Sequence, residues 1–208
     1  MKEKEIERLK NLKEFENNLH STGLKYIAGI DEAGRGPLAG PVVVGIAIMK
    51  PDSFIEGVND SKKLSEKKRE QLYEQIISEA IDWTVGIVDQ KEIDEINILN
   101  ATKKALHMAI SNLKVKPDRI LVDALEHIDT YGIPYTSIIK GDAKIYSISV
   151  ASIIAKVTRD RIMQEYDEIY PEYGFSGHKG YGTAKHIQAI KEYGPCSLHR
   201  KTFIKKFV

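Results

Sequence analysis

The chain has 208 residues, of which 42% are hydrophobic, and its formal net charge is +1. This composition is sufficient for the core of one domain and excludes global disorder, whereas the balanced charge gives no argument for a nucleic-acid partner from the chain as a whole. The single cysteine, Cys196, excludes an internal disulfide, and no apolar run is long enough to cross a membrane. We therefore expect a soluble, cytoplasmic monomer without a membrane partner.

The N-terminal part of the sequence predicts two helices and three strands. Apolar residues at helical spacing precede Gly23, two apolar runs flank a glycine-rich loop, and Ser65 is suited to cap a helix N-terminus. The expected elements are a helix over 2–19, strands over 26–31 and 42–49, a helix from 65 to about 80, and a strand over 83–88.

The rest of the sequence predicts strands alternating with helices, which indicates an α/β layer with a mixed sheet. The expected elements are a helix over 97–113, strands over 120–122 and 135–139, and helices over 147–170 and 184–193. In the first of these helices, Leu99 and Leu106 belong to the apolar stripe expected to face the core. Asn97 and Asn100 lie on its polar face, where they are suited to bond nucleotide oxygens.

Four acids stand at the ends of predicted strands or next to a predicted helix. Asp31 and Glu32 follow the first apolar run, Asp123 ends the strand over 120–122, and Asp142 precedes the long helix. Because strand ends meet at one edge of an α/β sheet, these acids are expected to share a site. Carboxylates from several elements suit two Mg²⁺ ions and phosphodiester hydrolysis. Each acid alone has a simpler structural explanation.

Two questions about the acids stay open from the residues alone. Successive strand residues point to opposite faces, so Asp31 and Glu32 share one metal only if the backbone bends there, as the following glycines permit. Otherwise Glu32 serves a different ligand position. Asp160 competes with Asp142 for the fourth position, although Lys156 four residues earlier favours a pair on the helix surface.

Glycines and basic residues indicate contacts to phosphate or sugar. The loop Gly34, Arg35 and Gly36 exposes backbone N–H groups and adds a guanidinium, although a tight turn also explains its glycines. Tyr181, between two glycines, is suited to stack on a sugar or base, or else caps the core. The basic residues from position 171 onward attract a polyanion or form a solvated surface.

Several blocks, in their order along the chain, resemble the ribonuclease HII family. The blocks are GIDEAGRGP over 29–37, DSKKL over 60–64, LVD over 121–123, KGDA over 140–143, SVASIIAKVTRD over 149–160 and HKGYGT over 178–183. The resemblance implies an α/β, ribonuclease H-like mixed sheet flanked by helices, with a small C-terminal helical appendage. The lead-in helix is a departure, because it precedes the family's core. We therefore expect a helical extension over 1–24, a catalytic domain over 25–170 and a basic helical region over 171–208 packed on the catalytic domain.

The resemblance also implies the site and its chemistry. The catalytic and metal-binding residues are Asp31, Glu32, Asp123 and Asp142, with two Mg²⁺ or Mn²⁺ ions. Gly34, Arg35 and Gly36 then read the ribonucleotide 2′-OH and the nearby phosphate, and Tyr181 packs on the adjacent deoxynucleotide sugar. We also expect substrate contacts from Ser61, Lys62, Asn97, Asn100 and Lys144.

The implied partners are RNA/DNA hybrids and DNA duplexes with embedded ribonucleotides. Cleavage on the 5′ side of the ribonucleotide leaves 3′-hydroxyl and 5′-phosphate ends, which serves ribonucleotide removal during DNA repair and replication. Three alternatives stay open, namely a ribonuclease HIII, another nuclease or resolvase on the same fold, and a nucleic-acid-binding protein without catalysis. The extension is expected to clamp substrate, bind a partner or cover an edge of the fold.

Overall fold

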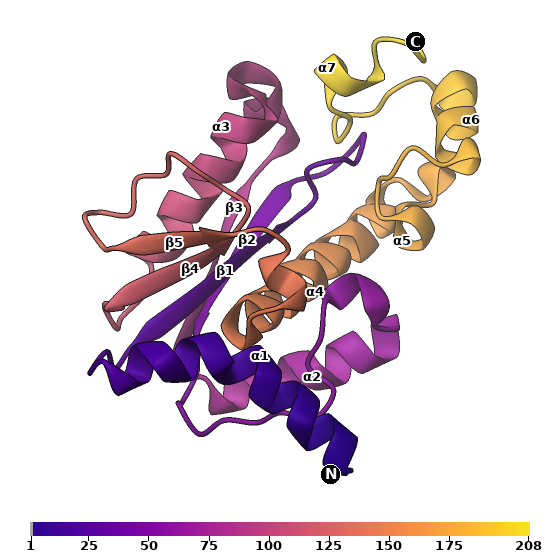
Figure 1. Ribbon diagram of the computed structural model, residues 1–208. Helices are drawn as coiled ribbons and strands as arrows, with labels where there is room; N and C mark the ends of the chain where they lie inside the picture. Colours follow the sequence, from indigo (N-terminus) through magenta and orange to yellow (C-terminus); the bar gives the residue numbers. More distant parts are fainter. Residues whose placement is uncertain (1) are drawn as a thin grey trace.

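A five-stranded mixed sheet forms the centre of the computed structural model, which describes residues 2–208 (Figure 1). Its strand order is β3-β2-β1-β4-β5, in which β2 is antiparallel to β1 and β3, whereas β4 is parallel to β1 and β5. The strands are β1 (Ile27–Ala33), β2 (Val42–Ile48), β3 (Asp82–Val88), β4 (Arg119–Asp123) and β5 (Tyr135–Ile138). The predicted α/β architecture with a mixed sheet is confirmed.

Helices cover both faces of the sheet. They are α1 (Glu3–Ser21), α2 (Glu66–Glu79), α3 (Gln90–Ser111), α4 (Tyr146–Ile169), α5 (Phe175–His178), α6 (Ala184–Tyr193) and α7 (Lys201–Ile204). Figure 1 shows α3 on one face and α4 on the other, with α1 beside the start of α4 and α5 to α7 beyond its end. Among residues 2–208, no helix is long and apolar enough to span a membrane.

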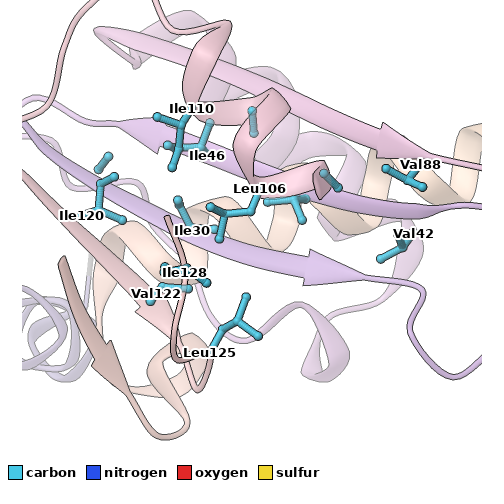
Figure 2. Close-up of a cluster of buried hydrophobic side chains, with 14 of the residues drawn as sticks. Ile30, Val42, Ile46, Val88, Leu106, Ile110, Ile120, Val122, Leu125 and Ile128 are labelled. Atoms are coloured by element: carbon cyan, nitrogen blue, oxygen red, sulfur yellow. The ribbon is translucent and has the colours of Figure 1, made fainter. Parts of the chain in front are cut away.

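The face covered by α3 is an aliphatic core. Figure 2 shows Ile30, Ile46 and Val122 of the sheet directed toward Leu106 and Ile110 of α3, all of them buried. Strand residues of alternate positions face the same side, so these side chains project from three neighbouring strands into one layer. Full burial of each such side chain stabilises the fold by about 1.5–3 kcal/mol.

The opposite face approaches α4 closely because glycines line it. A Cβ at Gly29 would lie 2.1 Å from the carbonyl carbon of Ser147, and one at Gly45 would lie 2.6 Å from the carbonyl oxygen of Ala151. Only residues without a side chain allow this contact. Gly45 pairs with Asp31 in the sheet, so the close packing brings α4 against the strand that carries the first acid.

The main departure from the predicted elements is at α3. The helix begins at Gln90, seven residues before the predicted start, and Asp89 caps it by accepting a bond from the Glu92 N–H. Asn97 interrupts it with φ 66° and ψ 164°. This kink changes which residues face the sheet, so Leu99 is 43% exposed and the expected apolar stripe is wrong at that position. The short helices α5 and α7 are also absent from the predicted elements.

Candidate active site

Parallel pairing of β1 with β4 brings the first acids together. Ile30 is paired in register with Val122, so the residues that come next, Asp31 and Asp123, lie beside each other on the two adjacent strands. Asp31 is buried and Asp123 is half-buried at the end of its strand. Asp123 ends β4, whereas β1 continues for two residues beyond Asp31, so the parallel pairing places the two acids on adjacent strands although Asp31 is not at a strand end.

A short 3₁₀ turn over Gly141–Ala143 places Asp142 beside Asp123. The Gly141 N–H donates to Asp123 Oδ1 at 2.7 Å, which ties the turn to the end of β4. The Ser149 hydroxyl of α4 donates to the Asp142 backbone carbonyl at 2.8 Å. Asp142 is thus held from both sides, and its carboxylate is also buried.

Glu32 occupies a separate position in this cluster. The pairing of β1 with β2 continues without a break through Ala33, so the bend that would direct Asp31 and Glu32 to one ion is absent. The Arg35 Nη1 lies 3.4 Å from Glu32 Oε1, and Glu32 lines a hollow together with Arg35. This regular strand favours the alternative in which Glu32 contributes at a different metal-ligand position from Asp31.

Burial and repulsion between carboxylates shift Asp31, Glu32 and Asp123 toward their protonated forms. Burial and then the neighbouring charge of Glu32 raise the pKa of Asp31 well above its usual value. Burial also raises the pKa of Glu32 and of Asp123, and nearby carboxylates add to both shifts. Acids that repel one another in this way form a site that a cation stabilises.

The donor set fits a divalent cation with oxygen ligands, such as Mg²⁺ or Mn²⁺. As the side chains stand, no three His, Cys, Asp or Glu residues within 2–208 are arranged to hold a metal ion. Instead, the Lys62 ammonium lies 3.1 Å from Asp142 Oδ2 and neutralises that carboxylate. A cation at Asp142 Oδ2 would therefore compete with this ammonium.

Two neighbouring hollows are lined by Glu32, Asp123 and Asp142 but not by Asp31, and Lys62 lines both of them. One, of about 400 Å³, is lined by Asp123 and Asp142. The other, of about 180 Å³, contains most of the predicted substrate contacts. Its lining includes Glu32, Gly34, Arg35, Gly36, Ser61, Lys62, Ser152, Lys156 and Tyr181. The predicted ribose-reading glycines and Tyr181, whose side chain is 45% exposed, thus share one surface.

The remaining predicted substrate contacts differ in their positions. Ser61 is buried at the hollow, with its hydroxyl 2.8 Å from that of Ser152. Lys144 lies close to Asp142 in sequence, and its ammonium donates to the Ile139 carbonyl at 2.8 Å. Asn97 and Asn100 line neither hollow, and Asn97 Oδ1 accepts the Asn100 N–H as a helix cap.

Asp160, the rival for the fourth position, is neutralised elsewhere. Its carboxylate accepts bonds from Lys156 at 2.5 Å and from Arg69 at 3.3 Å. The predicted Lys156 pair is present, but the expectation that it lies on the helix surface is wrong, because Asp160 is buried.

Two buried arginines beside the site are not among the residues predicted from the sequence. Arg159 and Arg200 donate to backbone carbonyls of the loop that contains Gly34 to Pro41. The spacing of Arg159 from Ala151 and Ala155 places it on the buried face of the long helix, which is a usable signal. The sequence around Arg200 has no such helical spacing of apolar residues that would predict its burial.

The fold and the site together define a phosphodiester hydrolase with a ribonuclease H-like fold. The family model for ribonuclease HII matches residues 28–206. The chain is 57% identical over 206 residues to a ribonuclease HII of Acetivibrio thermocellus, and the match covers 99% of this chain and 80% of the relative. The chain belongs to the ribonuclease HII family, and it is a metal-dependent endoribonuclease.

Solved structures agree with this fold. The ribonuclease H2 of Pyrococcus horikoshii superposes with a TM-score of 0.74 at 33% identity, covering 88% of this chain and 96% of that one. A ribonuclease HIII, Bst-RNase HIII in complex with Mn²⁺, superposes with a TM-score of 0.64 at 18% identity. The match covers 83% of this chain and 63% of that one. The second likeness shows a shared fold, and the sequence match assigns the chain to the HII family rather than HIII.

Proposed function

We propose that this protein hydrolyses the phosphodiester bond on the 5′ side of ribonucleotides, both in RNA/DNA hybrids and in DNA duplexes with embedded ribonucleotides. The products would carry 3′-hydroxyl and 5′-phosphate ends. The observation that carries the proposal is that Lys62 lines two neighbouring hollows, one lined also by Asp123 and Asp142 and the other by Glu32 and the loop of Gly34, Arg35 and Gly36. Acids for catalysis and a loop for ribose recognition therefore lie within reach of one nucleotide.

The acids Asp31, Glu32, Asp123 and Asp142 would hold two Mg²⁺ or Mn²⁺ ions. When bound, such ions activate water and stabilise the leaving oxygen. The complex of Bst-RNase HIII with Mn²⁺ supports this choice of metals. The Gly141 N–H orients the Asp123 carboxylate by donating to its Oδ1 at 2.7 Å, which leaves Oδ2 for a cation.

The loop residues supply recognition. The exposed Arg35 guanidinium is suited to a charge-assisted bond with a phosphate, and the Lys62 ammonium has the same capacity once it leaves Asp142. Backbone groups at Gly34 and Gly36 would bond the ribose 2′-OH. A polar group left unpaired by deoxyribose costs about 1–3 kcal/mol, which favours ribose by roughly 5- to 150-fold.

Tyr181 completes the proposed substrate surface. Its ring lies near Gly36, where an added Cβ would be 3.9 Å from the ring. This position suits packing on the sugar that follows the ribonucleotide.

We further propose that the protein acts as a monomer in the cytoplasm on DNA.

Cleavage of a labelled DNA duplex with one ribonucleotide, with and without Mg²⁺, tests the proposal. We expect a single Mg²⁺-dependent nick 5′ of the ribonucleotide, and no nick in an all-DNA duplex. Asp123→Asn should abolish nicking while the duplex still binds. Near-normal turnover by Asp123→Asn would falsify the site assignment, and faster cutting of a four-way junction than of this duplex would favour a resolvase.

A further inference from the structure

Arg159 connects the two segments that line the recognition hollow. We refer to residues 34–41 as the ribose loop and to residues 178–183 as the tyrosine loop. Arg159 is 1% exposed on α4, and its Nε and Nη2 donate to the ribose loop at the carbonyls of Pro41 (2.9 Å) and Ala39 (3.1 Å). Its Nη1 donates to the tyrosine loop at the carbonyl of Lys179 (2.9 Å). One rigid guanidinium thus fixes both loops.

Arg200 makes a similar set of bonds to the ribose loop alone. It is fully buried, and it donates to the carbonyls of Gly34 at 2.6 Å, Arg35 at 3.0 Å and Gly40 at 2.8 and 3.0 Å. A longer bond of 3.2 Å reaches Pro41. None of these partners belongs to the tyrosine loop. The two arginines can therefore be compared directly, because Arg159 bonds to both loops whereas Arg200 bonds only to the ribose loop.

Neither arginine has a carboxylate partner within the described residues 2–208. Burying an unpaired charge is costly, so packing alone does not explain why two guanidinium groups occupy this place. Burial is the main cause that lowers the pKa of Arg200 to about 9, and the charge of Arg159 adds to it. What a guanidinium offers here is a planar fork of donors whose directions are fixed, which holds several carbonyls at set positions.

The tyrosine ring depends on the same contacts. The Leu38 N–H of the ribose loop donates to the Gly180 carbonyl of the tyrosine loop at 2.8 Å. The guanidinium carbon of Arg159 lies 5.9 Å from the centre of the Tyr181 ring. A change in the fork of Arg159 would therefore change the separation between Gly36 and Tyr181.

We propose that Arg159 is a positioning residue that sets the spacing between the ribose loop and Tyr181, and thereby the preference for a ribonucleotide followed by a deoxyribonucleotide. Arg200 sets the shape of the ribose loop only. The inference rests on the proposed function, because it assumes that the ribose loop and Tyr181 contact adjacent sugars. A displacement of about 1 Å in such a surface is enough to change a rate by about 10²-fold.

The test compares kcat/KM for two duplexes, one with a single ribonucleotide in DNA and one that is a uniform RNA/DNA hybrid. Arg159→Lys keeps the charge and loses the fork, so we expect its preference for the first duplex to fall by at least about tenfold. Arg200→Lys should lower kcat/KM for both duplexes by a similar factor. Adding Tyr181→Ala to Arg159→Lys should lower the preference no further, because both changes remove the same contact. Equal losses on both duplexes for Arg159→Lys, or additive effects in the double variant, would overturn the proposal.

Hydrogen exchange gives a second measurement that needs neither a variant nor turnover. In the unchanged protein, the Leu38 and Tyr181 amides should have one common protection factor. Both factors should rise equally when the single-ribonucleotide duplex is added in EDTA, which prevents cleavage. Independent exchange of the two amides contradicts the bridging role. If the wild-type protein cuts neither duplex, the proposed function fails, whereas the exchange result still decides whether the loops move together.

Discussion

The ammonium of Lys62 lies 3.1 Å from Asp142 Oδ2, so a side chain of this protein supplies the cation at one of the proposed metal ligands. The two partners differ in exposure, since the Lys62 side chain is 74% exposed and that of Asp142 is 9% exposed. Burial, the largest single cause, would lower the pKa of Lys62, but the bond to Asp142 and the negative charges of Asp142, Asp31 and Asp60 together outweigh it, so the pKa is raised. Lys62 therefore stays charged and competes with any other cation for this carboxylate.

Replacing Lys62 by methionine should separate metal binding from substrate binding. Without the competing ammonium, the Mg²⁺ concentration for half-maximal activity should fall, by about two- to tenfold for an interaction of roughly 0.5–1.5 kcal/mol. At saturating Mg²⁺, KM for the duplex should rise because a phosphate contact is lost. Lys63→Met is the matched control, since Lys63 is 4.0 Å from Asp60 and should not alter the Mg²⁺ dependence. Equal Mg²⁺ curves for all three proteins would contradict the competition.

Asp142→Asn and Asp160→Asn should have opposite effects on activity and stability. We expect Asp142→Asn to abolish cleavage and to leave the melting temperature unchanged or higher, because it removes a charge that repels Asp123. Asp160→Asn should retain Mg²⁺-dependent cleavage but melt several degrees lower, because Lys156 and Arg69 lose their buried counter-charge. Thermal unfolding and duplex cleavage, measured on the same samples, check the predictions for both variants. An inactive but fully stable Asp160→Asn protein would reverse the assignment.

Two glycines of the ribose loop should respond differently to alanine. Gly34 has φ +96°, and a Cβ there would lie 2.2 Å from Arg159 Nε, so Gly34→Ala should destabilise the protein by at least about 1–3 kcal/mol. At Gly36 the nearest atom to a Cβ is on the Tyr181 ring at 3.9 Å, so Gly36→Ala should fold normally. Its methyl group would stand where the sugar approaches, and KM should rise by about tenfold or more. Urea unfolding measures the stability of both variants, and steady-state cleavage measures their KM. A fully active Gly36→Ala protein would argue against close approach of the backbone to the substrate.

Glu16 links the N-terminal helix to the start of α4, and its effect on stability should depend on pH. The Ser147 N–H donates to Glu16 Oε1 at 2.6 Å, and burial raises the pKa of Glu16. A folded-state pKa above the unfolded value favours folding when the carboxyl is protonated, and this contribution is lost as the pH rises through the folded-state pKa. The Glu16→Gln variant keeps the acceptor without the charge. The stability of wild type relative to Glu16→Gln should thus be greater at pH 4 than at pH 7.5.

Urea unfolding of both proteins at the two pH values checks this expectation, because the difference between them removes the contributions of the other acids. A difference that does not change with pH, or that changes in the opposite direction, would show that Glu16 is ionised in the folded protein at low cost.

Much of the fold is predictable because its determinants are local. The apolar runs of β1 and β2 predict strands, and the Ser65 hydroxyl accepts the Lys68 N–H as expected for a helix cap. The shared position of Asp31 and Asp123 is also predictable, since each follows a short apolar run and β1 and β4 pair in parallel. The predicted roles of these acids, of Asp142 and of the ribose loop remain predictions that the experiments above test.

The features that the sequence does not predict depend on contacts between distant residues. Arg200 contacts Gly34 across 166 positions of the sequence, and no local pattern marks a residue that bonds only to backbone carbonyls. The early start of α3 and its kink at Asn97 depend on two side-chain caps close together, which the apolar spacing of the helix does not reveal. The four-residue helices α5 and α7 are shorter than any periodicity can register.

The bonds from Arg200 to the ribose loop also have a consequence for biosynthesis. A ribosome adds Arg200 after every one of the proposed catalytic acids, so a nascent chain acquires its complete set of acids before the support of its recognition segment. Closing the long loop between Arg200 and the ribose loop costs chain entropy that only the completed fold offsets. A chain interrupted before Arg200 would therefore carry the proposed catalytic acids without the donors that hold its ribose loop in shape.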